Sequence, residues 1–296
     1  MPGVSIRGHF LWHELMTTDT QAAAAFYTRV IGWETQKWDQ DASYTLFTHK
    51  GVPMAGLMSL LPDARATGTP PSWMIYIGVP DVHVTAWEAQ RLGAKLHKGP
   101  TVTPSVGTWA ILQDPQGAAF ALYTPERIPD INAKPGLGDF SWHELATTDS
   151  RAAFSFYHDL FGWEKTDSMD MGPAGLYQMY GFGKRTLGGI YTKGKDAPGS
   201  PHWLAYVKVA DTKETTELLK QARGKVLSGP MEVPGGDWIT MGLDPQGAAF
   251  AVHSVAPKGA KTAPKSPRKA KKAKAVKHKV TERTAKARKG KQIRRK

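Results

Sequence analysis

The residues with the clearest chemical potential form a short motif that the chain carries twice. Trp12-His13-Glu14-Leu15 recurs as Trp142-His143-Glu144-Leu145. A carboxylate enclosed by aromatic walls has a raised pKa and can act as a general base or as a hydrogen-bond anchor for a ligand. Glu14 and Glu144 are therefore the candidate catalytic residues. The alternative is that each satisfies backbone donors or pairs with an arginine.

Composition and spacing argue against several other kinds of site. The chain has no cysteine, which excludes disulfides, thiolate metal sites and cysteine nucleophiles. The Gly-Gly pairs at 188–189 and 235–236 lack the following helix that a phosphate-cradling loop requires. No spacing argues for a Ser-His-Asp triad. We expect a cytoplasmic protein with no membrane partner, because residues 1–7 lack a secretion signal and no run approaches the roughly 20 apolar residues of a membrane span.

The motif belongs to a long internal repeat with a constant offset of 130 residues. The run from Asp114 to Ala121 returns unchanged as Asp244 to Ala251. Shorter matches follow the same offset: Thr17-Thr18-Asp19 with Thr147-Thr148-Asp149, Phe26-Tyr27 with Phe156-Tyr157, Gly32-Trp33-Glu34 with Gly162-Trp163-Glu164, and Gly99-Pro100 with Gly229-Pro230. A period this long indicates a repeated domain rather than a solenoid unit.

The repeat predicts four parts of the chain. We expect a first domain at 1–125, a linker at 126–138, a second domain at 139–256 and a disordered tail at 257–296. Each domain is long enough to bury its own core.

Each domain is expected to hold two strand–helix–three-strand modules, which makes the fold class α+β. A strand at 9–17 precedes a helix capped by Thr18 or Asp19 and ended by Gly32, and strands at 33–38, 43–49 and 52–60 follow. A Pro/Gly/Thr-rich link at 62–72 leads to the second module. This module has a strand at 73–79, a helix from Asp81 and three more strands. The second domain repeats this order, with helices starting near Asp149 and Asp211.

Four βαβββ modules resemble the vicinal-oxygen-chelate superfamily, which contains glyoxalases, bleomycin-resistance proteins and dioxygenases. The resemblance covers about 250 residues. It rests on four features in order: the strand followed by an Asp-capped helix, the Phe-Tyr on that helix, the Gly-Trp after it and the Asp-Pro-Gln-Gly turn before the last strand. It implies that each pair of modules forms an open barrel whose concave cavity holds a small molecule and often a divalent metal.

The resemblance also shows where metal ligands belong, and this chain has other residues there. The family's ligands lie on the first, fifth and eighth strands. The corresponding residues are Trp12, Met74 and Ala121 in the first domain and Trp142, Leu204 and Ala251 in the second. None of these six is a usable ligand, so we predict no cofactor. A divalent Fe, Mn, Ni or Zn ion remains the alternative, held by Glu144, His202 and His253.

Side chains two positions from these lost ligands point into the same cavity, because side chains alternate along a strand. The predicted ligand cavities contain Trp12, Tyr76 and Tyr123 in the first domain, and Trp142, His202, Tyr206 and His253 in the second. His13 and His143 fall on the helix-facing side and are interpreted as structural, unless a bulge turns them inward. Trp73 and Trp203 either pack at the rim or core, or stack on a flat ligand. Phe26-Tyr27 and Phe156-Tyr157 are interpreted as core.

The tail differs from the rest of the chain in composition and charge. Residues 257–296 contain 18 Lys or Arg and one acid, Glu282. The net charge of +13 thus divides into about −4 for the body and about +17 for the tail. Lys/Ala runs and Ser266-Pro267-Arg268-Lys269 resemble linker-histone tails. We expect a disordered segment that binds nucleic acid without sequence specificity and associates the protein with the nucleoid; a solubilising or membrane-binding tail is the alternative.

Three functions follow from these features. The favoured one is a glyoxalase- or bleomycin-resistance-like protein that binds a small organic molecule in aromatic cavities, with or without lyase-like chemistry. The second is a metal-dependent lyase or dioxygenase in which only the second domain is active. The third is a nucleoid-associated architectural protein. Because the tandem repeat is already a pseudo-dimer, a monomer or a homodimer is expected.

Overall fold

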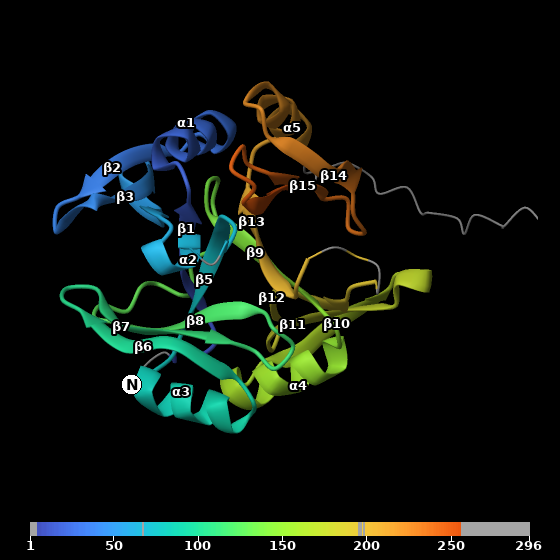
Figure 1. The fold of residues 1–296 in the computed structure, drawn as a ribbon. Coiled ribbons are helices and arrows are strands. Elements are labelled where there is room, and N and C mark those ends of the chain that lie inside the picture. The colour runs from blue at the N-terminus through green and yellow to red at the C-terminus, as the bar shows by residue number, and fades with distance from the viewer. Residues whose placement is uncertain (1–4, 67, 195–196, 198, 256–296) are drawn as a thin grey trace, which may run out of the picture. The chain divides into compact units, whose positions relative to one another are not determined.

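Each copy of the repeat folds into one open, mixed sheet of eight strands, as the computed structural model shows (Figure 1). The structure describes residues 5–255 except for 67, 195–196 and 198, so the predictions for 257–296 lie outside the described residues. The first repeat contains β1 (Phe10–Thr17), α1 (Thr20–Ile31), β2 (Glu34–Trp38), β3 (Asp41–His49), β4 (Val52–Ser59), α2 (Pro62–Ala66), β5 (Ser72–Gly78), α3 (Val82–Arg91), β6 (Lys95–Thr103), β7 (Gly107–Gln113) and β8 (Ala119–Pro125). The second contains β9 (Phe140–Thr147), α4 (Ser150–Phe161), β10 (Glu164–Asp170), the 3-10 turn η1 (Gly172–Ala174), β11 (Leu176–Phe182), β12 (Arg185–Thr192), β13 (His202–Lys208), α5 (Thr212–Gln221), β14 (Lys225–Glu232), β15 (Trp238–Leu243) and β16 (Ala249–Ser254).

The order of the strands shows how the four modules pair. The first sheet runs β2-β3-β4-β1-β5-β8-β7-β6, and the second runs β10-β11-β12-β9-β13-β16-β15-β14. Within each sheet the two modules meet at one antiparallel pair, β1 with β5 and β9 with β13. Modules that are neighbours in the chain therefore build each sheet, and the predicted α+β fold of four βαβββ modules in open sheets is confirmed.

The predicted helix starts are confirmed by their capping bonds. Asp19, Asp81, Asp149 and Asp211 each accept backbone N–H groups of the first turn through the side chain. Gly32 ends α1 at φ 83°, a left-handed conformation that glycine adopts without a steric penalty. The link at 62–72 departs from the prediction, because residues Pro62–Ala66 form the short helix α2.

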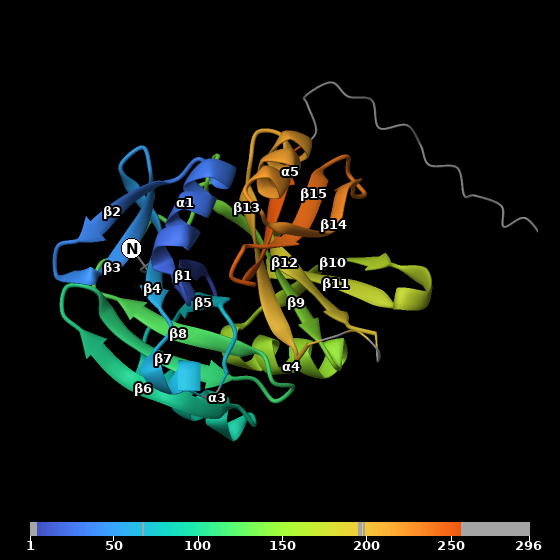
Figure 2. The same cartoon turned by 45° about the horizontal axis from the view of Figure 1, so that its top comes forward.

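Each repeat is long enough to bury its own core, but the two large cores are shared between the repeats. One large core combines the first repeat's β5, α3 and β8 with α4 and β9 of the second repeat. The other combines β1 and α1 of the first repeat with β13, α5 and β16 of the second. The helices accordingly lie in pairs from different repeats, α1 beside α5 and α3 beside α4 (Figures 1 and 2). The sequence gives the apolar faces of the helices but not the partner against which each face is buried.

Reciprocal hydrogen bonds join the repeats at these shared cores. Tyr27 donates to the carboxylate of Asp244 at 3.2 Å, and Tyr157 donates to Asp114 at 3.0 Å. The other carboxylate oxygen of each aspartate accepts backbone N–H groups within its own Asp-Pro-Gln-Gly turn. This double use accounts for the turn's presence in both repeats. It also confirms the core interpretation of Phe26-Tyr27 and Phe156-Tyr157, all four of which are buried.

Trp73 and Trp203 belong to the same cores. Each indole N–H donates to a core tyrosine, Trp73 to Tyr27 at 2.9 Å and Trp203 to Tyr157 at 3.2 Å. The core interpretation of both tryptophans is therefore confirmed over stacking on a ligand. Among the described residues, no helix combines the length and apolar character needed to span a membrane.

Candidate functional site

The concave face of the first sheet carries a cavity of about 530 Å³. A volume of this size is typical of small-molecule sites. Its wall is largely aromatic, and Glu14, Asp41 and two cationic side chains also line it. The lining includes Trp12, Glu14, Met16, Trp38, Tyr44, Tyr76, Lys98, Trp109, Ile111, Tyr123 and Arg127. The predicted cavity residues Trp12, Glu14, Tyr76 and Tyr123 thus lie together in one cavity.

Two phenols hold the Glu14 carboxylate. Tyr44 donates to Oε2 at 2.7 Å, and Tyr76 donates to Oε1 at 3.0 Å. The indole N–H of Trp12 in turn donates to the Tyr44 hydroxyl at 3.3 Å. The result is a directed Trp–Tyr–Glu chain in which every donor points toward the carboxylate. The alternative prediction, that Glu14 satisfies backbone donors or an arginine, is not what these contacts show.

Glycine at position 56 makes this arrangement sterically possible. Gly56 is the β4 partner of Glu14, and a Cβ atom added there would lie 1.7 Å from the Tyr44 hydroxyl oxygen. Any side chain at position 56 would therefore displace the phenol from the carboxylate. Gly189 has the same place in the second sheet, opposite Glu144, where an added Cβ would lie 2.1 Å from the Tyr177 ring.

Burial sets the electrostatics of the site. It raises the pKa of Glu14 above the ordinary value of 4.5, while the hydrogen bonds from Tyr44 and Tyr76 and the charge of Lys98 partly offset this rise. Burial and the nearby Glu14 charge raise the pKa of Tyr44 and of Tyr76, so both phenols remain donors. Lys98 lies with its ammonium 5.2 Å from the Trp109 ring centroid, which places a cation beside an aromatic wall.

The second sheet repeats the chain of donors. Trp142 donates to the Tyr177 hydroxyl at 2.9 Å, and Tyr177 donates to Glu144 Oε2 at 2.9 Å. Tyr206 is a further hydrogen-bond partner of Glu144, and burial raises the pKa of this carboxyl also. The predicted grouping of Trp142, Glu144 and Tyr206 therefore holds.

Tyr44 and Tyr177 were missed by sequence reasoning. Tyr44 follows Trp12 by 32 residues, whereas Tyr177 follows Trp142 by 35. A comparison at constant offset therefore never aligns the two tyrosines. The signal that could have found them is a glycine on the next strand, Gly56 or Gly189, which leaves room for the tyrosine side chain.

The residues at the superfamily's ligand positions converge but do not fit a divalent metal. Trp12, Met74 and Ala121 pack in one cluster on the first concave face. Trp142, Leu204 and Ala251 pack in the matching cluster of the second repeat. Indole, thioether, isobutyl and methyl groups lack the imidazole and carboxylate donors that such a metal needs. The residues at these positions therefore do not fit a divalent metal in either repeat.

The alternative metal set of Glu144, His202 and His253 is not assembled. His202 is exposed at the start of β13 and bonds the Ser200 carbonyl. His253 bonds Ser141 and Asp237, while Glu144 bonds Tyr177. Within the described part of the chain, no group of three or more His, Cys, Asp or Glu side chains could hold a metal ion.

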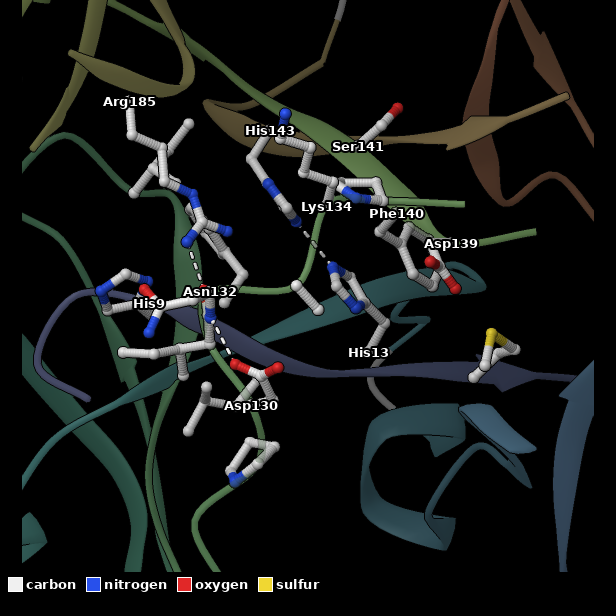
Figure 3. Close-up of a pocket in the computed structure, with 18 of the residues that line it drawn as sticks. His9, His13, Asp130, Asn132, Lys134, Asp139, Phe140, Ser141, His143 and Arg185 are labelled. Carbon is white, nitrogen blue, oxygen red and sulfur yellow. Dashed lines mark hydrogen bonds between the residues drawn. The ribbon is translucent and has the colours of Figure 1, made fainter. Parts of the chain in front are cut away.

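His13 and His143 meet at a second cavity, which lies between the repeats. Their Nε2 atoms are 2.8 Å apart, and the side chains are 5% and 6% exposed (Figure 3). His13 stacks on Phe140 and His143 stacks on Phe10, with ring centroids 3.6 and 3.5 Å apart. Burial lowers the pKa of His13 well below its ordinary value and that of His143 to about 3. The structural interpretation of both histidines is confirmed.

Comparisons with known proteins agree with this geometry. Residues 13–123 match the glyoxalase-like domain, and residues 140–252 match the glyoxalase/bleomycin resistance protein/dioxygenase superfamily. A Mycobacterium tuberculosis (strain CDC 1551 / Oshkosh) protein named "Putative glyoxylase CFP32" is 30% identical over 83% of this chain and 95% of its own length. The chain belongs to the glyoxalase/bleomycin resistance protein/dioxygenase superfamily.

Other known proteins resemble the chain more distantly. The anthracycline biosynthesis protein DnrV of Streptomyces peucetius is 27% identical over 81% of this chain and 91% of that protein. The 2,3-dioxygenase LapB from Pseudomonas sp. KL28 has a TM-score of 0.60 at 11% identity, over 86% of this chain and 94% of its own. The Mn(II)-bound glyoxalase from Novosphingobium aromaticivorans has a TM-score of 0.58 at 16% identity, over 85% and 83%. At these identities the two structures show a shared fold.

Proposed function

We propose that the first repeat binds a planar, oxygenated aromatic molecule in its concave cavity, with Glu14 as the acceptor of a ligand hydroxyl and without a divalent metal. The observation that carries this proposal is a half-buried carboxylate that is held by two phenols and lines a tryptophan-walled cavity. The second concave face repeats the anchor at Glu144, so it is a second candidate binding surface.

The chemistry of the cavity favours such a ligand. Trp12, Trp38 and Trp109 offer flat apolar surfaces for stacking. Lys98 and Arg127 line the cavity together with Glu14 and Asp41, so an oxygenated ligand meets both hydrogen-bond donors and acceptors. A phenol or enol bound at Glu14 would transfer or share its proton with a carboxyl whose pKa is raised, so binding can extend to general-base catalysis.

The relatives support the ligand class. DnrV is named as an anthracycline biosynthesis protein, and anthracyclines are planar and rich in phenolic hydroxyls. CFP32 carries the name "Putative glyoxylase", so the proposal includes lyase chemistry on the bound molecule. The metal-dependent lyase or dioxygenase expected as the alternative has less support, because the described residues of neither repeat bring suitable ligands together.

The experiment is a fluorescence titration of the full-length protein with 1,4-dihydroxyanthraquinone, read as quenching of tryptophan emission. Glu14→Gln should weaken binding about ten- to a hundredfold, because a hydrogen bond to a charged group contributes roughly 1.5–3 kcal/mol. Glu144→Gln is the matched control for this cavity and should leave the first-site affinity within about twofold of wild type. Equal affinities for Glu14→Gln and wild type would refute the proposal.

The tail completes the proposed function. It would hold the binding domains on nucleic acid through its 18 basic residues. If 6–10 phosphates are contacted, affinity should fall on the order of a thousandfold or more between 50 and 200 mM salt. Electrophoretic mobility shifts of full-length and 1–256 proteins at both salt concentrations test this part independently of ligand binding.

A further inference from the structure

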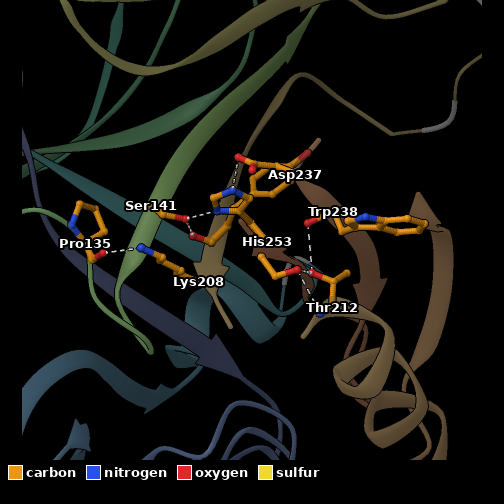
Figure 4. Close-up of polar contacts among 9 residues, drawn as sticks. Pro135, Ser141, Lys208, Thr212, Asp237, Trp238 and His253 are labelled. Atoms are coloured by element: carbon orange, nitrogen blue, oxygen red, sulfur yellow. Dashed lines mark hydrogen bonds and ion pairs between the residues drawn. The ribbon is translucent and has the colours of Figure 1, made fainter. Parts of the chain in front are cut away.

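Three polar side chains of the second repeat form a connected array outside the Glu144 site. The hydroxyl of Ser141 lies 3.0 Å from Nδ1 of His253, and Nε2 of His253 lies 3.0 Å from Oδ2 of Asp237 (Figure 4). The three residues come from β9, β16 and the turn before β15. Their separation in the chain explains why no spacing in the sequence indicated them.

A β-bulge places the serine. Val207 pairs with Phe140 and Tyr206 pairs with Trp142, so Ser141 is the extra residue on β9. Bulges redirect a side chain that regular alternation would point elsewhere. His253 pairs directly with Ile239 and follows Ala251 on the same face of β16, which puts it on the edge of the second concave face.

The hydrogen-bond chemistry fixes the direction of the array. An ionised carboxylate only accepts hydrogen bonds, so Nε2 of His253 is the donor to Asp237. In a neutral imidazole the other nitrogen, Nδ1, then carries a lone pair and accepts the Ser141 proton. The Tyr206 carbonyl competes for this proton only at 3.4 Å. This is the arrangement of a nucleophile, a general base and an orienting carboxylate.

The first repeat lacks every element of this array. At the equivalent positions it has Leu11 for Ser141, Tyr123 for His253 and Gly107 for Asp237. The array is therefore not a consequence of the shared fold. The side chains of His253 and Asp237 are 18% and 37% exposed, so the array is reachable from solvent.

We propose that Ser141, His253 and Asp237 form a second, metal-independent site at which Ser141 is acylated by carboxylic esters. The apolar residues beside His253, among them Ile239, Met241 and Trp142, favour esters with an aryl or alkyl group. This site is independent of the ligand cavity proposed for the first repeat.

The reaction balances without any further reactant than water. The Ser141 oxygen attacks the ester carbonyl as its proton passes to Nδ1 of His253, and Asp237 stabilises the imidazolium through Nε2. The ester C–O bond then breaks, and the alcohol leaves with the proton from His253. A water molecule gives one proton to His253 and its oxygen to the acyl carbon. The carboxylic acid is released and the Ser141 hydroxyl is restored.

The test uses the full-length protein with p-nitrophenyl acetate, whose hydrolysis is followed as release of p-nitrophenolate, and separately with a biotinylated fluorophosphonate, whose serine adduct is not turned over by water. We expect one covalent adduct per chain, located on the peptide that contains Ser141 by mass spectrometry. Locating the adduct on the wild-type protein requires no variant and so does not depend on whether a variant folds. An adduct elsewhere, or no adduct at all, overturns the proposal.

Variants separate a nucleophilic site from a structural hydrogen bond. Ser141→Ala should abolish the adduct, and His253→Gln should slow its formation about a hundredfold or more. Ser43→Ala is the matched control, because Ser43 also bonds a carboxylate, Asp41 at 2.6 Å, but is linked to no histidine in the structure as described. It should react like wild type. Equal adduct formation in the Ser141→Ala and Ser43→Ala proteins would contradict the assignment.

Discussion

The concave faces of the two repeats share a glutamate held by a tyrosine and a tryptophan, here called the anchor. They differ in the residues around this anchor. Both hold a half-buried glutamate through a Trp–Tyr–Glu chain of hydrogen bonds. Around Glu14 the first repeat has Lys98 and Trp109, where the second has Ser228 and Ile239. The second repeat instead has His253 and its partners at the edge of the face.

This difference shows which features belong to the fold and which to a particular chemistry. The anchor depends on a glycine that leaves room for a phenol, and that requirement is met twice. The residues at the rims face a ligand rather than the core, so the two copies are free to diverge. One fold thus carries an aromatic cavity with charged residues of both signs in one repeat and a Ser-His-Asp array in the other.

The largest effect is expected from filling the space beside the anchor. Gly56→Ala places a methyl group against the Tyr44 hydroxyl, so the Tyr44–Glu14 hydrogen bond must break. We expect loss of 1,4-dihydroxyanthraquinone binding and a fall of about 2–3 kcal/mol in the free energy of unfolding. Gly189→Ala should destabilise comparably and leave first-repeat binding intact. If Gly56→Ala binds the probe normally, the steric account of the anchor is wrong.

The next effect concerns the histidine pair, the place where identical residues of the two repeats touch. The pKa of His143 is about 3 and that of His13 is also lowered, so below the ordinary value of 6.5 the unfolded chain binds protons that the native state does not. Stability is therefore unaffected by the pair above pH 6.5 and falls as the pH drops below it. The expected slope is about 1.4 kcal/mol per pH unit for each histidine.

Urea denaturation between pH 7 and pH 5 measures this slope. The His13→Gln/His143→Gln double variant should show a flatter pH dependence than wild type, whatever its absolute stability. The slope, rather than the stability, isolates the pair, because the raised pKa values of Glu14 and Glu144 act in both proteins and with the opposite sign. Parallel curves for the two proteins would show that the pair does not resist protonation.

A smaller effect is expected when the first repeat is given a residue of the second. Lys98→Ser removes the charge that lowers the pKa of Glu14, so this pKa should rise further. Binding of 1,4-dihydroxyanthraquinone should weaken by about three- to tenfold and become less sensitive to salt. Titrations at 20 and 300 mM salt provide the comparison. Unchanged affinity and salt dependence would show that Lys98 does not face the ligand.

The smallest effect is expected from one phenol. Tyr76→Phe removes the 3.0 Å bond to Glu14 Oε1 but leaves the Tyr44 bond to the other oxygen. The pKa of Glu14 should rise, and the free energy of unfolding should change by about 1 kcal/mol. A pH titration of probe affinity should then lose binding at a higher pH than in wild type, because the ligand hydroxyl needs an ionised acceptor. If the pH at which binding is lost does not change, Tyr76 does not influence the pKa of Glu14.

Much of this fold could be predicted from the sequence, because its signals are local. Asp19, Asp81, Asp149 and Asp211 mark helix starts through capping, and strand alternation placed Glu14 and Tyr76 on one face. The pairing of neighbouring modules and the shared cores could not be predicted, since apolar faces do not specify their partners. Tyr177 was not predicted because its spacing from Trp142 differs from that of the matching pair in the first repeat. Ser141 was not predicted because a β-bulge interrupts the alternation of side chains along β9.

The central claim is that the first repeat binds its ligand through Glu14 and needs no divalent metal. The most direct test is isothermal titration of 1,4-dihydroxyanthraquinone into the full-length protein, once after dialysis against EDTA and once with added Mn²⁺. The account predicts a Glu14-dependent site of the same affinity in both titrations. Binding that appears only with Mn²⁺, or that persists in Glu14→Gln, would contradict it.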